Sequence, residues 1–178
     1  GANTYNWSGG VNNGVAFNPT SSGIYYVTGT DTNGCTNSAQ VTVVVNPLPV
    51  ITASASPAAV CAGSSVTLSG NGGISYSWSG GITNAVPFVP ASSGSYTVTG
   101  TDMNGCSNST SVGVTVNPVP PVSASAFPSA TVCQGTSIAL FGSGASSYAW
   151  SGGANNGVSF TPSASATYTV TGIDANGC

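Results

Sequence analysis

The sequence repeats itself with a period of 71 to 72 residues, and this length limits what the chain can fold into. Residues 1–49 align with residues 72–120, and residues 144–178 align with the start of both. One tryptophan and one cysteine recur in all three segments: Trp7, Trp78, Trp150, Cys35, Cys106 and Cys178. A second cysteine position is shared by two segments and is occupied by Cys61 and Cys133. A period this long exceeds most solenoid repeats and predicts small domains in series, each with its own core.

Two proline-rich segments divide the periods and predict the domain boundaries. Asn46–Pro49 and Asn117–Pro121 should be stiff, extended linkers, because proline fixes φ. We therefore expect a partial repeat over residues 1–46 that lacks its first strands, a complete repeat over 47–117, and a repeat over 118–178 that lacks its last strand. Because the sequence opens inside a repeat and without Met, we expect it to be a piece of a longer chain.

The second repeat carries the pattern of short β-strands. Val66 and Leu68 alternate with Ser and Thr, and Ile74, Tyr76 and Trp78 share one face of the next predicted strand. Asn-Gly turns separate alternating runs, and no helical period appears. About seven short strands with one buried Trp are typical of an immunoglobulin-like sandwich. The predicted fold is all-β, with tandem immunoglobulin-like β-sandwich domains arranged as a rod.

The composition excludes most chemistry. The chain has no Lys, Arg or His, only three acidic residues, and 2% charged residues in all. Without these side chains, we expect no enzymatic activity, no cofactor and no nucleic-acid binding. The 40% of hydrophobic residues predicts a folded core. No apolar run of 18 residues occurs, so we expect neither membrane insertion nor a signal peptide within this sequence.

Three motifs of the second repeat resemble known secreted repeats. They are Val60 to Leu68 (VCAGSSVTL), Tyr76 to Gly81 (YSWSGG), and Gly94 to Cys106 (GSYTVTGTDMNGC). These motifs look like the tandem Ig-like and PKD-like repeats of Bacteroidetes surface proteins, and the resemblance covers essentially the whole chain. It implies an extracellular or cell-surface location, an adhesin or gliding-associated protein exported by type IX secretion, and a stalk or fibre role. PKD domains usually carry acidic residues after this Trp, where the present chain has Ser79-Gly80-Gly81.

The five cysteines of a chain that looks secreted predict disulfides rather than a zinc site, because there is no His and no C-x-x-C motif. Two pairings are open. Within repeats, Cys61 would bond Cys106 and Cys133 would bond Cys178. Between repeats, Cys61 would bond Cys178, and Cys35, Cys106 and Cys133 would pair with repeats outside this sequence. A disulfide needs Cα atoms within about 7 Å, whereas a strand of eight residues spans ~26 Å, so sandwich topology favours the second pairing.

Aromatic and acidic residues recur at fixed positions and have two interpretations each. The acidic residues should cap turns, although a turn with Asp-x-Asn-Gly also echoes a calcium loop: Asp31, Asp102 and Asp174. The aromatic residues should form the core, with the tyrosines as tyrosine corners: Trp7, Trp78, Trp150, Tyr25, Tyr96, Tyr168, Phe17, Phe88 and Phe160. An aromatic platform for sugars is the alternative, formed by the three tryptophans and the tyrosines two residues before them, Tyr5, Tyr76 and Tyr148. Thr-x-Thr pairs could match ice or glycans but also suit the solvent face of a sheet.

The absence of cations also bears on partners. Soluble β-proteins usually guard exposed strand edges with Lys, which this chain lacks, so we expect its partners to be neighbouring repeats and other copies of the same protein. The sequence therefore predicts a structural repeat of an extracellular filament or adhesin stalk, stiffened by disulfides and proline linkers. The alternative is a glycan- or surface-binding adhesin module that uses loops such as residues 79–85 and 155–157.

Overall fold

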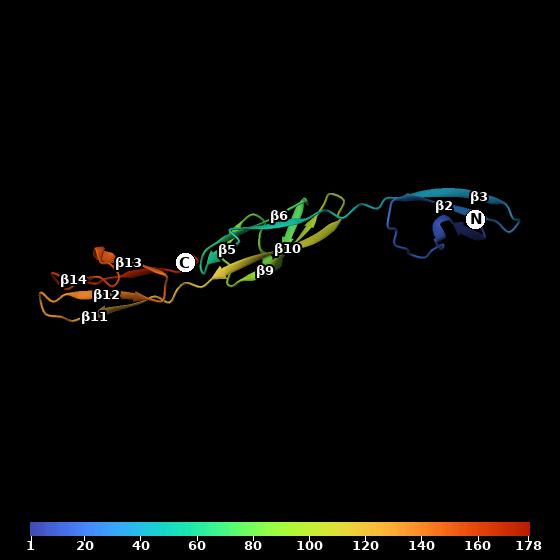
Figure 1. Ribbon diagram of the computed structural model, residues 1–178. Coiled ribbons are helices and arrows are strands. Elements are labelled where there is room, and N and C mark those ends of the chain that lie inside the picture. The colour runs from blue at the N-terminus through green and yellow to red at the C-terminus, as the bar shows by residue number, and fades with distance from the viewer.

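The computed structural model describes residues 1–178 and confirms that the fold is all-β. Strands form three successive groups that follow the three repeats along the chain, with extended segments between them (Figure 1). The only helices are single 3-10 turns that directly follow each tryptophan: η1 (Ser8–Gly10), η2 (Ser79–Gly81) and η3 (Ser151–Gly153).

The second repeat contains two sheets. Its strands are β4 (Thr52–Ser56), β5 (Ala59–Cys61), β6 (Val66–Asn71), β7 (Ser75–Trp78), β8 (Pro87–Phe88), β9 (Gly94–Thr101) and β10 (Ser107–Asn117). One sheet has the order β4-β6-β8 and the other has the order β5-β10-β9-β7. All pairings are antiparallel except that of β5 with β10, which is parallel. Pro57, which has no N–H to donate, lies between β4 and β5, where the chain passes from one sheet to the other.

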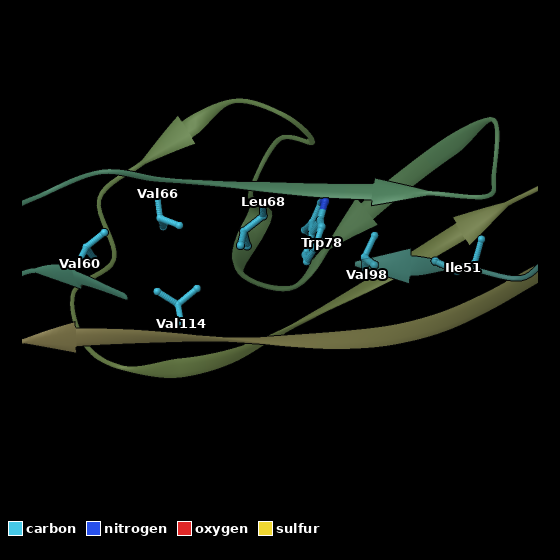
Figure 2. Packing of buried hydrophobic residues seen from close by; sticks show 7 residues of the cluster. All are labelled: Ile51, Val60, Val66, Leu68, Trp78, Val98 and Val114. Atoms are coloured by element: carbon cyan, nitrogen blue, oxygen red, sulfur yellow. The ribbon is translucent and has the colours of Figure 1, made fainter. Parts of the chain in front are cut away.

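The core of this repeat lies between the two sheets (Figure 2). Val66 and Leu68 on β6 point inward and are almost fully buried, while Thr67 and Ser69, which alternate with them, are only partly buried. Val98 on β9 is also completely buried. This alternation follows from the pleat of a strand, which places successive side chains on opposite faces. The remaining members of the buried cluster are Ile51, Val60, Trp78 and Val114.

The first and third repeats contain some of the elements of the second. The first has β1 (Thr4–Trp7), β2 (Gly23–Thr30) and β3 (Thr36–Val43) in one sheet. The third has β11 (Ser123–Phe127), β12 (Ile138–Ser143) and β14 (Ser159–Phe160) in one sheet, and β13 (Ser147–Trp150) with β15 (Val170–Ile173) in another. The tryptophan faces a valine on the neighbouring strand in every repeat, in the pairs Trp7↔Val27, Trp78↔Val98 and Trp150↔Val170.

Three details of the expected core differ from the structure. Phe17 was expected in the core but is 42% exposed, because the first repeat has only one sheet and no second sheet covers this face. Ile74 was expected on the inward face with Tyr76 and Trp78, but it precedes the first residue of β7 and is 71% exposed. The expected tyrosine corner is misplaced, because the hydroxyl that binds the backbone belongs to Tyr76, which donates to the Gly73 carbonyl (2.6 Å). Tyr96 instead packs edge-on against Phe88, with the ring centroids 5.4 Å apart.

Candidate functional site: the junction of the second and third repeats

The turn between β9 and β10 is held by one carboxylate. Oδ1 of Asp102 accepts hydrogen bonds from the backbone N–H groups of Asn104 and Cys106, both at 2.9 Å. The N–H of Asp102 donates to the carbonyl of Cys106 (3.0 Å). Gly105 has a φ of +80°, a conformation that glycine adopts without steric cost. These bonds close the five residues into a fixed loop with the cysteine at its end.

The same loop recurs in the other two repeats. Asp31 Oδ1 accepts from Asn33 and Cys35, and Asp174 Oδ1 accepts from Asn176 and Cys178, all at 2.8 Å. The backbone N–H of Cys178 is the chief cause that holds the pKa of the Asp174 carboxyl below its ordinary 3.8. One oxygen of each carboxylate is therefore occupied by the turn itself, which is the capping role expected for Asp in such loops.

Cys61 does not end such a turn and instead ends a short strand. Cys61 is the last residue of β5 and lies opposite Asn117, the last residue of β10. The carbonyl of Asn117 accepts a hydrogen bond from the N–H of Ala62 (2.8 Å). A tight turn follows, in which Ser64 N–H donates to the Cys61 carbonyl (2.9 Å). Cys61 therefore lies beside the residue at which the chain leaves the second repeat.

Cys61 forms a disulfide with Cys178, and their Cα atoms are 5.5 Å apart. The bond joins the second repeat to the third, which is the between-repeat pairing that sandwich topology favours. The alternative bond of Cys61 with Cys106 is wrong for a geometric reason. Cys106 directly precedes β10 and Cys61 lies opposite its last residue. The 11 residues of β10 separate them by ~34 Å, far beyond the ~7 Å that a disulfide spans.

The other three cysteines are free thiols. Cys35 and Cys133 are exposed and Cys106 is half-buried. Cys133 was the partner of Cys178 in the within-repeat alternative, and that pairing is also wrong because Cys178 is already bonded. No group of three or more His, Cys, Asp or Glu side chains lies close enough together to hold a metal ion.

The tryptophans are fixed by an asparagine that the sequence reasoning missed. In the second repeat, Trp78 is 5% exposed and its Nε1 donates to Oδ1 of Asn84 (3.0 Å). The same oxygen accepts from the N–H of Gly70 on β6 (2.7 Å), so one amide links both sheets. Trp7 and Trp150 make the corresponding bond to Asn13 and Asn156, both at 3.1 Å. An Asn six residues after each Trp was the signal in the sequence.

Aromatic side chains also line the inner face of the first repeat. An apolar hollow there is bordered by Trp7, Phe17, Tyr25, Val41 and Val43. In every repeat the phenylalanine and tyrosine of this face pack edge-on, as Phe160 and Tyr168 do at 5.4 Å. No charged side chain borders the hollow. Its residues correspond to the face that β6 covers in the second repeat, which marks the hollow as a packing surface.

The outer face of β9 and β10 presents a ladder of hydroxyl groups. Side-chain hydrogen bonds pair the two strands in three rungs, Thr97 with Ser111 (2.8 Å), Thr99 with Ser109 (2.8 Å) and Thr101 with Ser107 (2.9 Å). Thr28 and Ser38 form a rung in the first repeat (3.0 Å). Each hydroxyl therefore makes a hydrogen bond to the hydroxyl on the neighbouring strand, and these bonds stabilise the strand pair.

None of the three short helices has the length and apolar character needed to cross a membrane. No protein-family model matches the sequence, and no curated protein matches it.

Proposed function

We propose that this chain is a structural part of an extracellular filament or adhesin stalk, in which immunoglobulin-like domains follow one another as a stiff rod. The disulfide between Cys61 and Cys178 carries the proposal, because it joins two consecutive repeats and does not close a bond within one. A second covalent connection beside the linker restricts how the repeats bend. Such a bond stiffens an array.

The strand order supports the immunoglobulin-like assignment. In the second repeat, β4, β6 and β8 form one sheet, and β7, β9 and β10 form the core of the other. The first strand is split, and its second half, β5, pairs in parallel with the last strand. A buried Trp lies between the two sheets on β7, which is the third strand when the split pair β4 and β5 counts as one. Two packed sheets with this Trp are typical of immunoglobulin-like domains.

The chemistry of the chain supports an extracellular location and a passive role. Disulfides persist in oxidising surroundings such as the cell exterior. The chain contains no Lys, Arg or His, and its three carboxylates all carry turn hydrogen bonds. Edge strands without Lys leave backbone groups available to further copies of the protein. The resemblance to Bacteroidetes surface repeats points the same way.

The sugar-binding alternative finds no platform in the complete second repeat. A platform needs exposed rings, whereas Trp78 is buried and bonded to Asn84. The loops expected to bind, residues 79–85 and 155–157, contain the asparagines that fix the tryptophans. Both loops therefore have a structural role in every repeat.

Electron microscopy of the chain, with and without reductant, tests the proposal. The angle between the second and third repeats should be narrowly distributed when oxidised and should broaden after reduction. The first junction, which has no disulfide in this structure, is a matched internal control and should not respond. A Cys61→Ser, Cys178→Ser variant should behave like the reduced protein. Particles that are compact, or junction angles that ignore reduction, would contradict the proposal.

A further inference from the structure

We propose that the outer face of the β2–β3 hairpin in the first repeat binds a neutral polysaccharide, with the ring of Tyr26 stacked on a sugar unit. Three side chains surround this ring, Ile24 on β2 and Gln40 and Thr42 on β3, and we call the four together the hairpin patch. The patch lies on the face of the sheet opposite to Trp7, and the proposal goes beyond the structural role of the array.

The register of the two strands brings the four side chains together. Ile24 lies opposite Thr42, and Tyr26 lies opposite Gln40. Successive side chains of a strand point to opposite faces, so Tyr25 lines the inner hollow while its two neighbours point outward. Tyr26 is 51% exposed and Ile24 is 49% exposed. Both residues of β3 are also exposed, so the patch is open to solvent.

The exposure of this face is a property of the complete fold. The corresponding side chains of the second repeat are Ser95, Thr97, Ser111 and Gly113. All four are exposed, although the second repeat has both of its sheets. The other sheet packs against the opposite face, where Val98 and Val114 are buried. A second sheet packed on the first repeat in the same way would leave the hairpin patch exposed.

The hairpin patch distinguishes the first repeat from the other two. Where the first repeat has Tyr26, the second has Thr97 and the third has Thr169. In the second repeat, Thr97 and Ser111 bond each other at 2.8 Å as a rung of the hydroxyl ladder. Tyr26 and Gln40 lie opposite each other at the same place but form no rung. The first repeat therefore replaces a self-bonded pair with a phenol ring and an amide that remain available to a ligand.

The chemistry of the patch fits an uncharged sugar. One face of a pyranose ring presents C–H groups that pack against an aromatic ring, and its edge presents hydroxyl groups. The Gln40 amide both donates and accepts hydrogen bonds, and the Thr42 hydroxyl does the same. The chain has no Lys or Arg and a net charge of -3, which disfavours phosphate, nucleic acid and acidic sugars as ligands.

The size and shape of the patch favour a polymer over other neutral partners. Its strands are ~5 Å apart and its residues ~7 Å apart along each strand, so it covers on the order of 100 Å². A stable protein complex buries about 800 Å² on each partner, so a second copy of the chain would not stay bound here. A single small molecule usually requires a concave pocket, whereas this patch is part of a sheet face. A polysaccharide repeats the same unit, so weak contacts from several copies of the protein add up.

Retention of the full chain on insoluble cellulose, chitin and cross-linked dextran tests the inference, because all three are neutral polysaccharides. The unaltered chain should be retained on at least one of them. Tyr26→Thr introduces the residue that the second repeat has at this position, and it should weaken retention by about tenfold or more through loss of the aromatic anchor. Thr97→Ala is the matched control at that position of the second repeat and should leave retention unchanged. The inference is refuted if none of the three supports retains the chain, or if Tyr26→Thr is retained equally well.

A transfer variant tests whether these four side chains are sufficient. In the Tyr26→Thr background, the patch is rebuilt on the second repeat by Ser95→Ile, Thr97→Tyr, Ser111→Gln and Gly113→Thr. A Cβ at residue 113 meets no atom within 4 Å, so the site has room for the change. Retention should return to that of the unaltered chain. A transfer variant that is folded by circular dichroism but is not retained would overturn the inference.

Two further measurements separate the other outcomes. Sedimentation of the free protein reports self-association. A dimer that Tyr26→Thr abolishes would overturn the inference, because a second copy would then be the occupant of the patch. The angle between the second and third repeats in electron micrographs does not depend on Tyr26, since the disulfide of that junction lies in other repeats. Failure of sugar binding therefore leaves the proposed structural function intact, and a flexible junction would refute that function without affecting the patch.

Discussion

Replacing both Cys61 and Cys178 with alanine should destabilise the third repeat selectively. Cys61 lies beside Asn117, so when the third repeat unfolds alone, the disulfide closes a loop that runs from Asn117 to Cys178. This loop has about 60 residues, for which the chain-entropy relation gives about 4 kcal/mol of stabilisation. The full separation of 117 residues applies only when both repeats unfold together, and it gives about 5 kcal/mol.

Native-state hydrogen exchange, read by mass spectrometry on peptides from each repeat, measures this difference. In the double variant, the slowest amides of β12 and β15 should exchange about a thousandfold faster, or lose protection entirely. The first repeat provides an internal control, since no disulfide touches it. A Cys35→Ala, Cys133→Ala variant removes two free thiols and should leave monomer exchange unchanged. The reasoning is refuted if all three repeats lose protection equally, or if the third loses less than about tenfold.

Three further predictions concern single residues. Leu68→Ala removes a side chain with no exposed surface and should cost about 2–5 kcal/mol in urea denaturation, whereas Ile74→Ala, at 71% exposure, should cost little. Gly72→Ala places a Cβ against the carbonyl oxygen of Val50 at a φ of +95° and should cost at least about 1 kcal/mol. Gly113→Ala meets no atom within 4 Å and should be neutral or better. The turn bonds of Asp174 stabilise its ionised form, so their contribution is present above the ordinary pKa of 3.8 and is lost as pH falls through the lowered pKa; an NMR titration midpoint at or above 3.8 would contradict these bonds.

The sequence predicted features that depend on local pattern. Alternation at Val66 and Leu68 predicted a strand with one buried face, and both residues are buried on β6. The pairing of Cys61 with Cys178 followed from the strand directions of a sandwich and the short reach of a disulfide. Both inferences needed only the period of a strand and the lengths of its elements.

Features that depend on contacts between distant segments were missed. β5 has only three residues and owes its existence to parallel pairing with β10, more than fifty residues later in the chain. The exposure of Ile74 depends on where β7 begins, and strand ends are poorly marked when Ser and Gly surround them. Tyr76, and not Tyr96, bonds the backbone through its hydroxyl, while Tyr96 packs against Phe88. Which tyrosine hydroxyl reaches a backbone carbonyl depends on the folded structure and cannot be read from the order of residues.

The position of the disulfide beside Asn117 also has a rotational consequence. A repeat attached by a single linker can spin about its long axis, because rotations about a few single bonds cost little. The third repeat is attached at two points, one at each side of the β5–β10 pair. Spinning would have to stretch or wrap one connection around the other. We expect torque applied at one end of an oxidised array to reach the other end, and a reduced array to swivel.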